Sequence, residues 1–218
     1  TLNLIKAMVE NNINNIVFSS TAAIFGNPKT KKIKESHKKS PISPYGKTKL
    51  IVEEMLDDFT KAYGLNATCL RYFNAAGAHH NSDIGEDHDP ETHLIPNIIK
   101  SILNKKNKLK VFGNTYKTHD GTCVREYIHV SALASAHLLA LKMMNKYHGM
   151  SKYNLGNSNG FSVLDIIKSC ERVIRTEIPF TIELPREGDP PSLIADSSQA
   201  KKYLGWNTKF SDIDNIIK

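Results

Sequence analysis

IVFSST (residues 16–21) and SPYGKTKL (residues 43–50) are the two stretches of sequence that decide the fold. The first is a short apolar run with hydroxyl residues at its carboxyl end, which predicts a buried strand. In the second, Ser43 and Pro44 are a typical N-cap and first helical residue. Apolar residues then recur at helical spacing to about residue 63, and Gly64 predicts the end of the helix. We therefore expect a strand, a loop and a long amphipathic helix in succession.

The same alternation of element types extends along the rest of the chain. Helical spacing predicts helices at residues 2–9, 94–104, 132–144 and 163–173, and short apolar runs predict strands at residues 67–72, 109–112, 127–130 and 153–155. The last residues, FSDIDNIIK (210–218), predict the start of one more amphipathic helix. Helices that alternate with short apolar strands are typical of an α/β fold with a mainly parallel sheet.

The composition is that of an ordinary globular protein. The chain has 218 residues, of which 40% are hydrophobic and 23% charged, with a mean hydropathy of −0.36. No apolar run approaches the ~18 residues of a membrane span, and the chain opens without a signal-peptide pattern, so we expect no membrane association. The three cysteines are widely spaced and never in a C-x-x-C pattern, which favours a reducing compartment, the cytoplasm. The absent initiator Met suggests a fragment.

The net charge of +7 comes from lysine more than arginine. Lysines are dense at residues 29–39 and 105–110, without interleaved aromatic residues, which favours a solvated surface over a nucleic-acid groove. We therefore expect no nucleic-acid partner. Arg125 and Arg186 are more informative, because a guanidinium group can bind phosphate through two parallel hydrogen bonds.

Tyr45 and Lys49 are four residues apart on the helix expected after Ser43, so they lie on one face of it. A cation beside a phenol favours the phenolate, which makes such a tyrosine a usable general base. The spacing alone is weak, since about one such pair is expected by chance in a chain of this composition. The context supports a catalytic role for the pair, because Thr21 ends the preceding strand and the active sites of parallel sheets lie beyond the carboxyl ends of their strands.

This order of strand-end hydroxyl, loop and Y-x-x-x-K helix resembles the short-chain dehydrogenase/reductase superfamily. Seven blocks in register, covering nearly the whole chain, resemble the UDP-glucose 4-epimerases of its extended branch. They are VFSSTAAIFG (17–26), SPYGKTKL (43–50), RYFNAAGAH (71–79), IGEDHDPETHLIP (84–96), VFGNTYKTHDGTCVREYIHV (111–130), YNLGNSNGFSVLD (153–165) and REGDPPSLIAD (186–196).

The resemblance implies a role for each matching residue. Tyr45 would take the proton of the sugar 4-hydroxyl, Lys49 would bind the nicotinamide ribose and tune Tyr45, and Thr21 would hydrogen-bond the sugar 4-oxygen. These three residues and Phe73 would contact NAD. Leu193 matches a position that bounds the space around the sugar 2-substituent, and its intermediate size leaves N-acetylated sugars possible. The positions that would enclose UDP are Asn74, His93, Leu94, Lys110, Val111, Phe112, Arg125, Arg186 and Asp189.

The resemblance also implies the architecture. Residues 1–75, with a return segment near 124–147, would be the C-terminal part of a Rossmann NAD-binding domain, a doubly wound parallel sheet. Residues 76–218 would be mainly a smaller α/β UDP-sugar-binding domain, truncated at its end. The family's G-x-x-G-x-x-G motif is absent from these 218 residues, so most of the NAD-binding half is missing. A full-length chain would form a homodimer through helices at residues 2–9 and 43–63.

Plainer interpretations stay open for several of these residues. Val111 and Phe112 could be ordinary core residues of a strand, and Arg125 could form a surface ion pair with Glu126. The segment from His79 to His93 could bind a divalent metal through His79, His80, Asp83, Glu86, Asp87, His88, Asp89 and His93. Their spacing fits no helix face or zinc knuckle and most of them match the family's acidic loop, so we expect no metal.

Other activities of the same branch are also possible. A 4,6-dehydratase needs an acid and a base just after the strand-end hydroxyl, whereas Ala22 and Ala23 follow Thr21 and cannot transfer protons. A decarboxylase is harder to exclude, although the block at residues 186–196 argues against it. An inactive or partner-dependent fragment that still binds UDP-sugars is the alternative of a different class.

Overall fold

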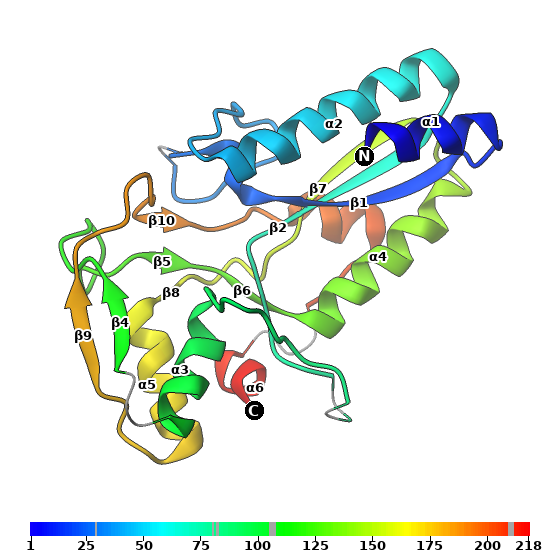
Figure 1. Cartoon of the computed structure of the whole chain (residues 1–218). Helices are drawn as coiled ribbons and strands as arrows, with labels where there is room; N and C mark the ends of the chain where they lie inside the picture. Colours follow the sequence, from blue (N-terminus) through cyan, green and yellow to red (C-terminus); the bar gives the residue numbers. More distant parts are fainter. Residues whose placement is uncertain (29, 80, 82, 105–107, 209–211) are drawn as a thin grey trace.

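The N-terminal elements of the chain are arranged around a three-stranded parallel sheet. The structure is a computed structural model, and it describes residues 1–28, 30–79, 81, 83–104, 108–208 and 212–218. The strands of the sheet are β1 (Asn15–Thr21), β2 (Asn66–Tyr72) and β7 (Met150–Asn154), in the order β1-β2-β7. Helices α1 (Leu2–Glu10) and α2 (Pro44–Tyr63) cover one face, and α4 (Val130–Met144) covers the other (Figure 1). β2 is buried nearly throughout, as expected for a strand covered on both faces.

Local sequence explains the bounds of α2, the helix that carries Tyr45 and Lys49. The Ser43 side chain accepts a hydrogen bond from the Gly46 N–H at 3.1 Å, and Pro44 occupies the first helical position. The helix ends at Gly64, whose φ of 71° lies in the left-handed region that glycine adopts without strain. The predicted bounds of this helix are therefore confirmed.

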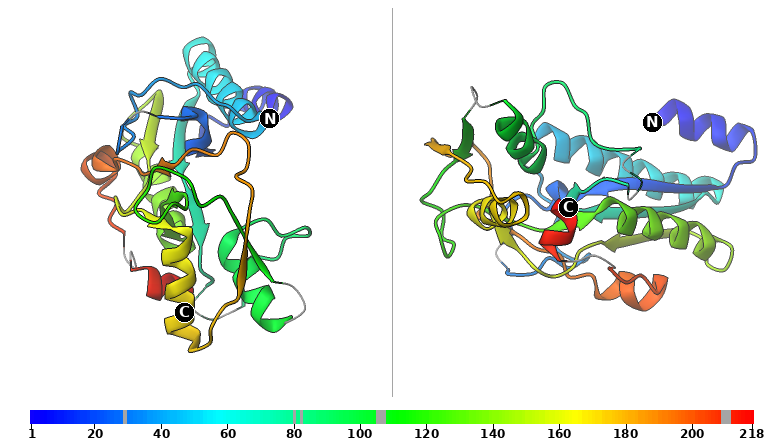
Figure 2. Two further views of the ribbon diagram at one scale, coloured as in Figure 1. Left: turned by 90° about the vertical axis from the view of Figure 1, so that its left-hand side faces the viewer. Right: turned by 90° about the horizontal axis from the view of Figure 1, so that it is seen from below.

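A second group of elements packs beyond the carboxyl ends of the parallel sheet. It contains three small sheets: β3 (Asn74–Ala76) with β6 (Tyr127–His129), β4 (Leu109–Phe112) with β9 (Phe180–Glu183), and β5 (Val124–Arg125) between β10 (Ser192–Leu193) and β8 (Phe161–Ser162). Helices α3 (Leu94–Leu103), α5 (Val163–Ile174) and α6 (Ile213–Ile217) share a core with these strands. The chain termini lie in different groups, the N-terminus at α1 and the C-terminus at α6 (Figure 2).

The predicted α/β architecture is confirmed, with local differences. The loop after β1 begins with a 3-10 helix, η1 (Ala22–Phe25), and then places Ile33 and Glu35 in the interior, while Lys31, Lys32 and Lys34 are exposed. β7 starts three residues before the predicted strand, because its pairing with β2 continues back to Met150. A π-helix, η2 (Ala200–Leu204), leads to the buried Trp206, whose indole N–H donates to the Ala132 carbonyl at 2.9 Å.

Some sequence predictions fall partly on undescribed positions. Lys29, His80, residues 105–107 and residues 209–211, which belong to the lysine-rich, histidine-rich and C-terminal segments, lie outside the described residues. Of the predicted C-terminal helix, the structure describes α6. Cys69, Cys123 and Cys170 are buried free thiols. Within the described ranges, no helix is both long and apolar enough to cross a bilayer.

Candidate functional site

The carboxyl end of β1 and the first turns of α2 bring three predicted site residues into one region. Thr21 is 7% exposed, and its hydroxyl oxygen accepts a hydrogen bond from the Ala23 N–H at 3.2 Å, which starts η1. The Lys49 ammonium donates to the Ser19 carbonyl at 2.9 Å and lies 5.8 Å from the centre of the Tyr45 ring. Tyr45 is 56% exposed. An accessible phenol beside an anchored cation is an arrangement that can exchange a proton with a bound hydroxyl group.

Phe73 and Leu193 contact the same buried cluster, although they come from distant parts of the sequence. Both pack against a buried cluster made of Ile24, Phe25 and Ile33, which also contacts Leu50 of α2. Ile24 and Phe25 belong to η1, the turn that Thr21 caps. The residue expected to flank nicotinamide and the residue expected to bound the sugar 2-substituent are therefore held by the same apolar cluster.

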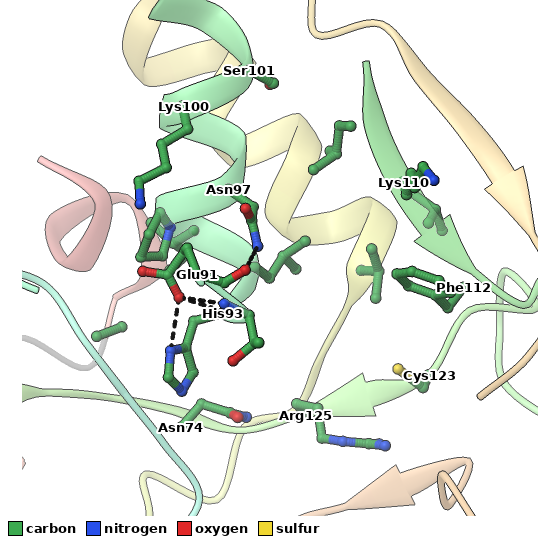
Figure 3. A pocket seen from close by; sticks show the side chains of 18 of the residues that line it. Asn74, Glu91, His93, Asn97, Lys100, Ser101, Lys110, Phe112, Cys123 and Arg125 are labelled. Atoms are coloured by element: carbon green, nitrogen blue, oxygen red, sulfur yellow. Dashed lines mark hydrogen bonds and ion pairs between the residues drawn. The ribbon is translucent and has the colours of Figure 1, made fainter. Parts of the chain in front are cut away.

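A cavity of about 880 Å³ opens in the second group of elements, next to α3, β4 and β5 (Figure 3). All nine residues that the sequence predicts to enclose UDP line it: Asn74, His93, Leu94, Lys110, Val111, Phe112, Arg125, Arg186 and Asp189. The lining does not include Thr21, Tyr45, Lys49, Phe73 or Leu193. The sequence analysis missed the further polar lining residues Asn97, Lys100 and Lys108, because its helical and lysine-rich patterns indicated only surface positions.

The two arginines of the cavity are held differently. Arg125 of β5 pairs with the Asp189 carboxylate, and its Nη1 also donates to the Val124 carbonyl at 2.8 Å. The Arg186 guanidinium lies 4.1 Å from the centre of the Phe112 ring. The turn between Arg186 and Asp189 is closed by a backbone hydrogen bond of 3.3 Å. Two guanidinium groups and an aromatic face thus line one cavity, which suits a ligand with anionic and planar parts.

The surface ion pair between Arg125 and Glu126 is not formed. Successive strand residues point to opposite sides, so Glu126 points away from Arg125, and it is fully buried. Its carboxylate accepts hydrogen bonds from the backbone N–H groups of Ala195, at 2.7 Å, and Ser158. Burial raises the pKa of Glu126 to about 7, although these N–H groups oppose the shift. Val111 is a core residue, as the plainer interpretation had it, and it also lines the cavity.

A buried ionic network that the sequence analysis missed joins α2 to the sheet. Arg71 is fully buried and forms two hydrogen bonds with the Glu53 carboxylate, at 2.9 and 2.6 Å. The Ser20 hydroxyl donates to the same carboxylate at 2.6 Å. Although burial opposes it, the Arg71 guanidinium holds the pKa of Glu53 below its ordinary value. Ser20 precedes Thr21 and Glu53 lies one turn after Lys49, so the network holds the backbone next to these two predicted site residues.

The family is identified by its sequence model. The model described as "NAD dependent epimerase/dehydratase family" matches residues 1–156. The chain belongs to this family. Within the NAD dependent epimerase/dehydratase family, curated proteins named UDP-glucose 4-epimerase from Halalkalibacterium halodurans and Lactobacillus helveticus are each 46% identical to it, over 218 and 216 residues. These alignments cover 100% and 99% of the chain.

Solved structures agree with the sequence relatives. A UDP-glucose 4-epimerase from Brucella ovis in complex with NAD matches 99% of the chain with a TM-score of 0.94 and 44% identity. The enzyme from Bifidobacterium longum, in complex with NAD+ and UDP, matches with a TM-score of 0.93 and 37% identity. The chain spans 65–66% of the length of the two curated relatives and of these two structures.

Proposed function

We propose that this chain is the larger part of a UDP-glucose 4-epimerase that interconverts UDP-glucose and UDP-galactose with bound NAD. The observation that carries the proposal is the lining of one cavity by all nine residues selected from the sequence as UDP ligands. The two relatives that are 46% identical to the chain are both named UDP-glucose 4-epimerase, which supports the proposal. The neighbouring Tyr45 and Lys49 supply the acid–base pair that such chemistry needs.

The carboxyl end of β1 fits a nicotinamide riboside, because it presents an anchored ammonium, an accessible phenol and the nearby Phe73 ring. When bound there, NAD supplies reversible hydride transfer at the sugar C4 carbon. Tyr45 takes the proton of the 4-hydroxyl as that carbon is oxidised, and it returns a proton when the sugar is reduced on its other face. Arg125, Arg186 and Lys110 hold the diphosphate and the uridine, while the hexose turns between the two steps.

Sister activities fit less well. Ala22 and Ala23 form the first turn of η1, where a 4,6-dehydratase would need proton-transferring side chains. The block at residues 186–196 resembles that of the epimerases, which argues against a decarboxylase. The size of Leu193 is compatible with N-acetylated UDP-hexoses. An inactive or partner-dependent form that retains UDP-sugar binding is the second candidate, since the chain contains the cavity residues proposed for UDP but spans 65–66% of the length of its relatives.

Three further proposals follow from the same resemblance. Residues 1–75 and the segment near 124–147 form the NAD-binding part, and residues 76–218 form most of the UDP-sugar-binding part. The full-length protein is a homodimer, supported by exposed Leu4 on α1 and exposed Ile51 on α2. It acts in the cytoplasm, in keeping with its free cysteines.

Calorimetric titration of the chain with UDP and with NAD tests the binding part of this proposal. We expect UDP to bind measurably and NAD much more weakly, because the residues proposed for UDP lie in the chain and the pyrophosphate-binding glycine loop does not.

Arg186→Ala should weaken UDP binding by about tenfold or more, since hydrogen bonds to a charged group contribute roughly 1.5–3 kcal/mol. Arg175→Ala removes an exposed arginine outside the cavity and should leave the affinity unchanged. Equal affinity of the two variants would contradict the assignment of the cavity.

A further inference from the structure

Two histidines and two glutamates converge at the edge of the cavity, where the acidic loop meets the start of α3. They are Glu86, His88, Glu91 and His93, and one ligand atom from each lies within 4.8 Å of the others. His93 is the N-cap residue of α3, and Glu91 and His93 line the cavity (Figure 3). The sequence analysis rejected a metal here because the spacing fits no helix face. The loop folds back on itself, however, and brings these four residues together although they do not share a helix face.

The separations between these atoms suit a small coordination sphere. The His93 Nδ1 lies 2.6 Å from Glu86 Oε1 and 3.0 Å from Glu91 Oε1, and the His88 Nδ1 lies 3.1 Å from Glu86 Oε1 and 3.8 Å from Glu91 Oε2. Four ligands bound to zinc at ~2.0–2.2 Å in a tetrahedron lie about 3.4 Å from one another. These four separations fall on both sides of that value, and the two of Glu91 involve different oxygens, so side-chain movements would have to complete the sphere.

Glu91 supplies an independent indication of a ligand. Its side chain is only 3% exposed, and its Oε1 accepts hydrogen bonds from the Thr92 and His93 backbone N–H groups at 2.7 and 2.8 Å. Its Oε2 is buried and has no hydrogen-bond donor in the part of the chain that the structure describes. A buried carboxylate oxygen is normally satisfied by a donor or a cation. The His88 Nδ1 lies 3.8 Å from this Oε2, so a cation between the two could satisfy it.

A second group of potential metal ligands provides a contrast. His119, Asp120 and Asp165 also converge, but the two carboxylates are already used. Asp120 accepts hydrogen bonds from Thr122 and Ser162, and Asp165 accepts one from the Ser162 backbone N–H at 2.9 Å, which caps α5. This group therefore needs no cation.

We propose that Glu86, His88, Glu91 and His93 bind one divalent metal ion of the zinc class. Imidazole nitrogen and carboxylate oxygen are ligands that zinc accepts, and two carboxylates with two neutral histidines give a site of charge −2 that a divalent ion neutralises. The ion would connect the acidic loop to the N-terminus of α3, whose first turn lines the UDP cavity. Its role would be structural: four protein ligands leave no open position for catalysis.

Metal binding to the purified chain tests this proposal without any measurement of activity. After treatment with EDTA and its removal, the chain should bind one Zn²⁺ in competition with a chromophoric chelator. With Co²⁺ as the probe, it should show visible absorption of the intensity typical of four-coordinate cobalt, well above that of the aqueous ion. This spectrum is read on the unaltered chain and requires no variant to fold.

Matched variants locate the ion. His88→Ala and His93→Ala should each weaken Zn²⁺ binding at least ~100-fold, since each removes a direct ligand. His119→Ala removes a histidine of similar exposure from the other cluster and should leave binding unchanged. The proposal is overturned if the chain binds neither ion stoichiometrically, as expected if charged histidines alone balance the glutamates. It is also overturned if Mg²⁺ or Ca²⁺ displaces Zn²⁺, or if His119→Ala abolishes binding while the loop variants retain it.

Discussion

At the scale of single residues, folding removes the Glu126 carboxyl group from water altogether. Its pKa rises from an ordinary 4.5 to about 7, mainly because burial disfavours the charged form. The folded state therefore binds the proton more tightly than the unfolded state. The contribution of Glu126 to the free energy of unfolding is therefore largest below about pH 4.5, and it is lost as the pH rises to about 7.

We predict that this loss amounts to about 3 kcal/mol between pH 4.5 and pH 8, on the scale of ~1.4 kcal/mol for each pKa unit. Glu126→Gln cannot ionise, so it should lack this part of the pH dependence. Urea unfolding of both proteins at pH 4.5 and pH 8 measures the difference, and contributions from other groups cancel in the comparison. Parallel pH profiles of the two proteins would show that Glu126 titrates normally.

At the scale of elements, the Arg71–Glu53 pair connects β2 to α2 and, through Ser20, to β1. We predict that Glu53→Gln lowers the free energy of unfolding by about 3–5 kcal/mol, because it leaves the Arg71 charge buried without its partner. The low pKa of Glu53 has a further consequence: its contribution is present above pH 4.5 and is lost as the pH falls below that value.

Urea unfolding measures this effect, and two variants make the comparison specific. Asp57→Ala breaks an exposed pair with Lys61 on the same helix and should hardly change stability. The double variant Glu53→Met with Arg71→Met removes both charges and should cost less than the sum of the two single changes. Additive effects would mean that the pair does not act as a unit.

The helices α1 and α2 carry the prediction about assembly. The side chains of Leu4, Ile51 and Tyr63 on these helices are 58%, 53% and 61% exposed. Large apolar side chains that are exposed together are typical of an interaction surface. If these helices form the dimer contact, the full-length protein should sediment as a dimer at micromolar concentration and Ile51→Glu should be monomeric. Leu138→Glu, at an equally exposed leucine on α4 across the sheet, should remain dimeric. A monomeric parent protein, or a reversed response of the two variants, would contradict this contact.

At the scale of the whole molecule, local pattern predicts the long elements but not the long-range contacts. Ser43, Pro44 and Gly64 set the bounds of α2 through interactions within a few residues of the helix ends, so the local sequence is enough. β5 and β10 have two residues each, and they pair with each other across 68 positions of the sequence. No periodicity can be read from segments so short.

Some residues of the candidate site could likewise be predicted from the sequence, and others could not. Tyr45 and Lys49 are neighbours on one helix and were found from their spacing together with the hydroxyl of Thr21 at the end of the preceding strand, whereas the cavity residues were selected by resemblance to a family. Glu53 and Arg71 were missed because charged residues in amphipathic or strand patterns usually indicate surface positions. Glu91 was missed because the fold of the loop, rather than its spacing, brings it to His88 and His93.

Turnover of UDP-glucose to UDP-galactose, measured on the chain completed with the missing third of its relatives, tests the proposed activity most directly. The completed protein should interconvert the two sugars. Tyr45→Phe should lower kcat by at least ~10²-fold, as expected for the loss of a general base. The control Tyr147→Phe alters an exposed tyrosine away from the site and should leave kcat unchanged. No interconversion by the completed protein, or undiminished turnover by Tyr45→Phe, would contradict the assignment.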